Sequence, residues 1–141
     1  MPFASLPPSL YFENPAGRLL ADAQGFVRLE WLPGSGDGAA VRAVFEQALV
    51  LLTSTGWSRM LINQQHLTPF TPETVQWLLT DWFPRATGPG YYRWGAILSA
   101  DNVFARLATT DMVGQARARH QMLYQYFEAE PAAISWLLSQ Y

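Results

Sequence analysis

The chain has neither cysteine nor lysine among its 141 residues, and each absence removes a class of chemistry. Without cysteine there is no disulfide framework, thiolate zinc site, iron–sulfur cluster or cysteine nucleophile. Without lysine there is no Schiff-base catalysis and no phosphate-binding lysine of a P-loop. The two histidines have no ligand spacing, so we expect no metal and no cofactor.

Charge is also scarce. Charged residues make up 14% of the chain, against about 25% in an ordinary domain, and apolar residues make up 50%. All the basic residues are scattered arginines and the net charge is −2, whereas nucleic-acid binders carry a basic stripe, so no nucleic-acid partner is expected. With so little charge, either much neutral polar surface is exposed on a monomer, or some apolar surface is covered by a protein partner, by a second copy in a homodimer, or by a ligand.

The length predicts a single domain over residues 1–141, with a loose proline-rich arm at 1–8. The start of the chain lacks the charged and apolar regions of a signal peptide. No apolar run is long enough to span a bilayer, so we expect no membrane span and a cytoplasmic protein.

Hydrophobic periodicity predicts an α/β domain, in which a mixed sheet is covered by helices. The alternating segment Phe26–Trp31 indicates a half-buried strand, as in an antiparallel meander at a sheet edge, and the apolar run Arg59–Ile62 indicates a central strand covered on both faces. Further strands are expected at 10–13, 18–21 and 93–99 and in the segment after residue 120, and helices near 38–55, 71–82, 101–119 and 131–138.

Local signals mark the ends of the predicted helices. Asp37 is a candidate N-cap for the first helix, and Gly56 closes it. Thr71 and Pro72 begin the second helix, and Pro84 should kink or end it. Within the second helix, Val75, Leu78, Leu79 and Trp82 form the stripe that should face the core.

Four patches carry a resemblance to a known family. They are YFENPAGRLL with GFVRLEW, TPETVQWLLTDWFPRA, WGAILSADNVFARLA and YFEAEPAAISWLL, which together span Tyr11 to Leu138. In these patches the chain resembles the STAS/SEC14-like domains, also called SpoIIAA-like, of small bacterial proteins. The resemblance implies a single mixed sheet of four to five strands covered by helices.

Better-known STAS relatives are protein-interaction modules, and some are switched by phosphorylation in an Asp-Ser-x-Gly-like loop after a central strand. The corresponding loop here is Asn63 to Thr68. It has no Asp-Ser pair and no glycine, so the resemblance gives no support for such a switch.

Other motifs are weak. Gly34, Gly36 and Ala39 fit a degenerate dinucleotide-binding pattern, but position 59, where an acidic residue is needed, is arginine. His66 could act as a general base beside Thr68, although an exposed loop histidine is the commoner case. Asn63, His66 and Thr68 are therefore weak loop candidates, and no catalytic residue is predicted.

An aromatic cluster suggests a binding surface. We predict that Trp77, Arg85, Tyr91 and Tyr92 border whatever the protein binds, because Trp77 is off the buried stripe and the tyrosines lie in a turn. Arg85 should also pair with Asp81 one helical turn earlier.

The sequence thus favours a non-catalytic regulatory or protein-interaction domain. The alternative is a carrier of a small apolar ligand held between sheet and helices, and a third reading is an enzyme that uses His66. A cavity of about 300 Å³ or more would favour the carrier, and a packed core with an exposed apolar patch would favour the interaction domain.

Overall fold

The structure, a computed structural model, describes residues 7–33, 38–120 and 123–140, and for residues 118–120 it describes the backbone alone. Most of the loose arm predicted at residues 1–8 lies outside the described residues, as does Asp37, the predicted cap of the first helix.

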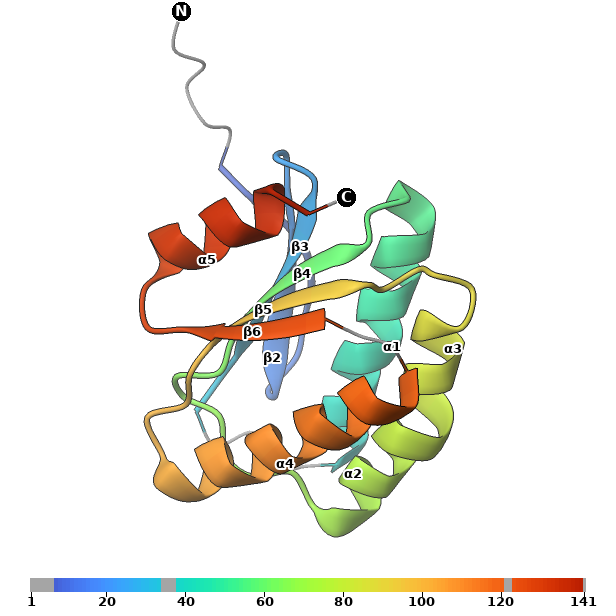
Figure 1. The fold of residues 1–141 in the computed structure, drawn as a ribbon, viewed down its shortest axis with the longest axis vertical. Coiled ribbons are helices and arrows are strands. Elements are labelled where there is room, and N and C mark those ends of the chain that lie inside the picture. The colour runs from blue at the N-terminus through green and yellow to red at the C-terminus, as the bar shows by residue number, and fades with distance from the viewer. Residues whose placement is uncertain (1–6, 34–37, 121–122, 141) are drawn as a thin grey trace, which may run out of the picture.

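A mixed sheet forms the centre of the molecule (Figure 1). Its six strands lie side by side in chain order, as β1 Ser9–Glu13, β2 Gly17–Asp22, β3 Phe26–Trp31, β4 Arg59–Asn63, β5 Trp94–Leu98 and β6 Leu123–Phe127. Strands β1 to β3 pair antiparallel, and β3 to β6 pair parallel. The α/β class is as predicted, but the sheet has six strands where four to five were expected.

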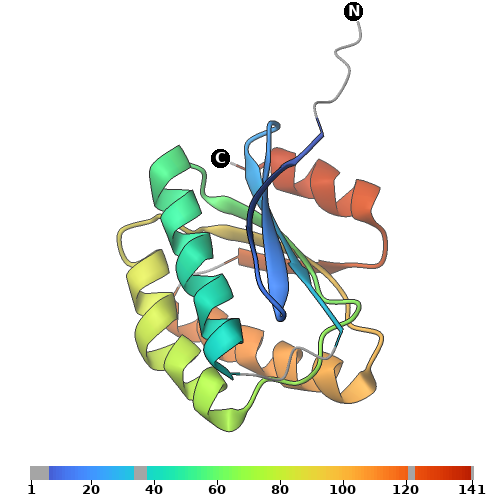
Figure 2. The same ribbon diagram turned by 180° about the vertical axis from the view of Figure 1, so that it is seen from behind.

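The helices cover the two faces of the sheet unequally. One face carries α1 Gly38–Thr55, α2 Pro72–Trp77, the π-helical segment η1 Leu78–Trp82, α3 Phe83–Thr87 and α4 Val103–His120. Among the described residues, α5 Glu130–Leu138 is the one helix on the other face, and it covers only part of that face (Figures 1 and 2).

Each face of the sheet has its own apolar core. The larger core joins the sheet to α1, η1, α3 and α4, and the smaller one joins it to α5. The smaller core consists of Phe26, Leu61, Trp94, Ala96, Leu98, Ala133 and Leu137. Strand β4 contributes to both cores, as its unbroken apolar run predicted.

Phe26–Trp31 belongs to an antiparallel meander of β1, β2 and β3 at one edge of the sheet, as predicted. This strand is β3, the third of six, and it pairs with β4 in parallel. Its alternation arises because Arg28 and Glu30 lie on the face that α5 only partly covers. A half-polar strand therefore indicates one incompletely covered face, which an interior strand can also have.

The second helix begins where it was predicted and continues past Pro84. Thr71 caps it by accepting a hydrogen bond from the Thr74 backbone N–H at 3.2 Å. Just before Pro84 the helix widens into a π turn, in which the Phe83 N–H bonds to the Leu78 carbonyl. Because proline clashes with the preceding helical turn, this local widening lets the chain continue as α3.

Candidate functional site

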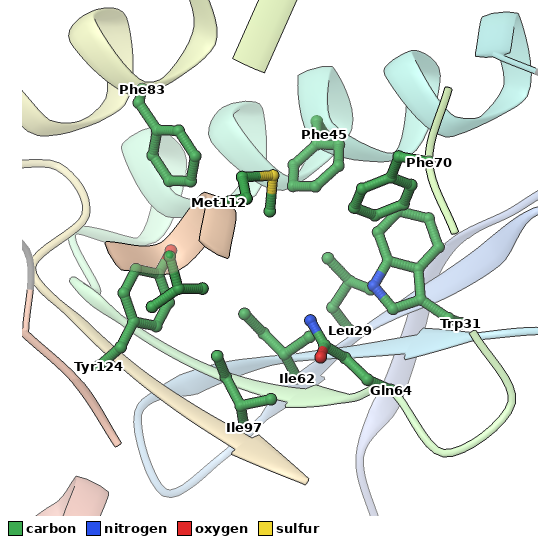
Figure 3. A pocket seen from close by; sticks show the side chains of 11 residues that line it. Leu29, Trp31, Phe45, Ile62, Gln64, Phe70, Phe83, Ile97, Met112 and Tyr124 are labelled. Carbon is green, nitrogen blue, oxygen red and sulfur yellow. The ribbon is translucent and has the colours of Figure 1, made fainter. Parts of the chain in front are cut away.

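A small cavity lies between the sheet and the helices on the larger-core face (Figure 3). Its free volume is about 20 Å³, which is room for roughly one water molecule. Its lining is almost wholly apolar and comprises Leu29, Trp31, Phe45, Ile62, Gln64, Phe70, Phe83, Ile97, Met112, Val113 and Tyr124. This cavity is therefore too small to hold a ligand larger than a water molecule.

Gln64 is the polar exception in this lining. It follows β4 and continues the alternation of Met60 and Ile62, so its side chain turns to the helix-covered face. The residue is only 4% exposed, and its Oε1 has no hydrogen-bond donor among the described residues. An unsatisfied buried acceptor of this kind costs about 1–3 kcal/mol.

Two buried tyrosines fill the space beside this cavity. The rings of Tyr92 and Tyr124 pack edge-on at 5.9 Å. They lie over Gly95, where an added Cβ would come within 2.7 Å of the Tyr92 hydroxyl and still closer to the Tyr124 ring. Burial raises the pKa of both hydroxyls, so these groups stay neutral at physiological pH and act as packing groups.

The opposite face of the sheet has a polar pocket of about 90 Å³ beneath the start of α5. Arg28 of β3 lines it, with its Nε 2.9 Å from Asp22 and its guanidinium paired with Glu130. Glu30 and Asn63 complete the polar lining. Because Arg28 is engaged by two carboxylates, its evident role is to fasten α5 to the sheet.

Helix α4 presents large apolar side chains to solvent. Val103, Phe104 and Leu107 are 56%, 75% and 64% exposed. We call these three residues the α4 outer face. The buried side chains described for this helix are three small ones, Ala105, Thr109 and Ala116, together with Met112 and Val113. It runs along the outside of the molecule (Figure 1), so the outer face is open to contact.

The residues predicted to form a binding surface differ in how exposed they are. Arg85 is exposed and pairs with Asp81 as predicted, with its Nε 3.1 Å from Oδ1, and it also bonds Glu46. Trp77 is half-buried, with the Arg42 guanidinium 5.6 Å from its ring. Tyr91 is 43% exposed. Binding by Trp77, Arg85 and Tyr91 stays a prediction.

Tyr92 is not at the surface, which corrects the prediction for that residue. It is 2% exposed. Its backbone N–H donates to the Ala86 carbonyl at 3.0 Å, which folds the turn back against α3. The ring is thereby placed over Gly95 inside the core, and its neighbour Tyr91 takes the outward position.

The weak loop candidates do not assemble into one site. Asn63 accepts a hydrogen bond from the Gln65 N–H at 2.9 Å and so shapes the loop. His66 is exposed, and Thr68 is half-buried. Asn63 lines the polar pocket and Gln64 lines the cavity, so the side chains of these adjacent residues lie on opposite faces of the sheet. Within the described ranges, no three or more His, Cys, Asp or Glu side chains are grouped as metal ligands.

Sequence reasoning missed Gln64 and the α4 outer face. Gln64 was taken as part of a polar loop, although the alternation of β4 extends to it. In α4, the apolar residues at 103, 104 and 107 fall outside the spacing of the buried positions. That mismatch was a usable signal of a second apolar face.

Comparisons with family models, with curated proteins and with solved structures gave no match. In the parts of the chain that the structure describes, no helix combines the length and the apolar character needed to cross a membrane.

Proposed function

We propose that this chain is a non-catalytic protein-interaction domain whose partner docks on the α4 outer face. The observation that carries the proposal is the exposure of Val103, Phe104 and Leu107 next to one another on a single helix. Isolated exposed apolar residues are common, but a contiguous group on one element is typical of a contact surface. The regulatory character of the STAS-like domains, which the chain resembles, agrees with such a role.

The energetics also favour a docking role. Burial of apolar surface contributes about 25 cal/mol per Å², so covering an exposed phenylalanine and its neighbours supplies much of a weak binding energy. Within the chain these side chains contribute little burial, since Phe104 is three-quarters exposed. Interfaces are enriched in aromatic residues, so we expect Phe104, beside Val103 on the same helix, to take part in the contact.

The carrier function is supported less well. The cavity under the helices has room for about one water molecule, whereas small-molecule pockets usually enclose roughly 300 Å³ or more. A packed core together with an exposed apolar helix face is the combination expected of an interaction domain.

Site-specific photo-crosslinking tests the proposal. A photoreactive phenylalanine analogue replaces Phe104 in one variant and Val50 in a matched control, since Val50 is 48% exposed on α1. In cells that naturally produce the protein, we expect a discrete protein adduct from position 104 and only background from position 50. Equal background at both positions would show that the α4 outer face is not a docking surface.

A further inference from the structure

We infer that the partner on the α4 outer face is a second copy of this chain, with the two α4 helices packed in parallel about a twofold axis. The inference rests on the proposed docking function and adds the identity and orientation of the partner. Three features of α4 carry it, namely a continuous seam, an unexplained glycine and a pair of complementary charges.

The seam runs along the solvent side of α4. Val103, Leu107, Thr110 and Gly114 are all exposed and are spaced by four, three and four residues. This is the spacing with which one helix follows another over successive turns. The buried positions of α4 lie on the opposite side of the helix, so a second helix could contact the whole seam without disturbing the core.

No contact among the described residues explains the glycine at position 114. It lies within α4 and is exposed, and a Cβ built on it would meet nothing within 4 Å. Glycine is the least favourable residue in a helix interior except proline. A glycine on a helix seam lets a second backbone approach closely, and this is the explanation that the twofold arrangement offers.

Arg106 and Asp111 decide the orientation. Both are exposed, they flank the seam on opposite sides, and they are five residues apart. In a parallel helix pair, a residue on one flank faces the residue five positions later on the other helix. Arg106 of each copy then meets Asp111 of the other, which gives two ion pairs. An antiparallel pair would bring like flanks together and would not match these charges.

Asp111 can exchange its hydrogen bond within α4 for an ion pair with a second copy, and no buried polar group loses its partner. In the single chain its carboxylate accepts a hydrogen bond of 3.0 Å from the Gln115 side chain of the same helix, at an exposed site. Because the seam covers only about three helical turns, we expect a small interface and a dimer with micromolar affinity, as is typical of transient contacts.

The test is a charge-reversal series on the purified full chain. Sedimentation velocity from micromolar to millimolar concentration should show a reversible dimer. R106E and D111R should each weaken it by about tenfold, because each change turns both ion pairs into repulsions. The double variant R106E/D111R should recover dimerisation. R93E, which makes an equal charge change at an exposed residue outside α4, is the control and should dimerise normally.

Mixing the two single variants gives the sharpest result. In the parallel arrangement, two copies of R106E repel each other, and so do two copies of D111R. One copy of each variant forms opposite-charge pairs at both contacts. Native mass spectrometry of an equimolar mixture should therefore show the heterodimer in excess of either homodimer. A mixture without that excess would overturn the parallel arrangement. All variants change exposed side chains, and circular dichroism checks that each is folded.

The outcomes separate the inference from the proposed function. The inference is overturned if the chain stays monomeric at millimolar concentration. It is also overturned if the affinity of the dimer is the same in R106E, D111R and the wild type. If position 104 then crosslinks to a different protein, the proposed docking function stands with another partner. If position 104 also gives only background, both are overturned.

Discussion

Helices α1 and α4 have the same length, 18 residues, and cover the same face of the sheet, yet they use their apolar residues in opposite ways. Helix α1 buries its large side chains, including Phe45, Leu51 and Leu52, and among them Phe45 is only 7% exposed. Helix α4 buries mainly small ones, and its own phenylalanine, Phe104, is 75% exposed.

The sheet shows how the fold tolerates this difference. Beneath α1, side chains of the helix itself fill the core. Near α4, Tyr124 of β6 lines the same cavity as Met112 and Val113, and it packs with Tyr92 over Gly95. Helix α4 can therefore lie on the core with small residues. The large apolar side chains of α4 are then not needed in the core and stay exposed. For this reason a contact role suits α4 and not α1.

The largest expected effect comes from making the same substitution on both helices. Phe45→Ala should destabilise the protein by about 3–5 kcal/mol, because the Phe45 ring contacts those of Trp31, Trp77 and Trp82. Phe104→Ala should change the free energy of unfolding by less than about 0.5 kcal/mol. Urea denaturation measures both values. Similar losses in the free energy of unfolding for the two variants would show that α1 and α4 do not differ in how they use their phenylalanines.

Gly95→Ala tests the claim that tyrosines fill the space near α4. The added methyl would collide with Tyr124 and come within 2.7 Å of the Tyr92 hydroxyl. We expect a loss of about 1–3 kcal/mol, as is usual for overpacking. Replacing Tyr124 with leucine in the same chain should recover part of this loss. If Gly95→Ala alone unfolds at the wild-type urea concentration, the tyrosine packing is misassigned.

Alkaline pH should reveal the same buried tyrosines. Burial raises the pKa of Tyr92 and Tyr124 in the folded state, so their stabilising contribution is complete below the unfolded pKa of about 10. Above that pH the unfolded chain loses protons that the folded chain keeps. Each group should then lower stability by about 1.4 kcal/mol per pH unit.

Denaturation between pH 9 and 11.5, a range set around the ordinary tyrosine pKa of about 10, gives this slope. In Tyr92→Phe, the loss of stability per pH unit should be smaller by the contribution of one tyrosine, about 1.4 kcal/mol. An unchanged slope in Tyr92→Phe would mean that this hydroxyl ionises as readily in the folded chain as in the unfolded one.

The smallest effect has opposite signs in the monomer and the dimer. Gly114→Ala should raise monomer stability by about 0.5–1 kcal/mol, because alanine favours helix and the site has open space. The same methyl should weaken self-association by separating the two seams. Denaturation at low concentration and sedimentation at high concentration measure the two effects. Stronger association in Gly114→Ala would contradict close packing at this position.

Much of the local structure was predictable. The apolar run of β4, the alternation of β3 and the cap at Thr71 all lie where the sequence placed them, and Gly56 ends α1 with a φ of +76°. These features depend on neighbouring residues, so periodicity and helix-end chemistry report them directly. The candidate site was predicted less well, because Tyr92 is buried and the α4 outer face was not singled out.

The sequence by itself therefore determined the α/β class, the order of the elements and most helix ends. The tertiary structure decided that β3 pairs with β4 as well as with β2, that α5 is the described helix on the second face, that Gln64 turns into the core and that Phe104 stays outside. Each of these depends on which distant element covers a given side chain. A periodic pattern shows that a residue has a buried or an exposed side, but the element that covers it is set only when segments far apart in the chain pack together.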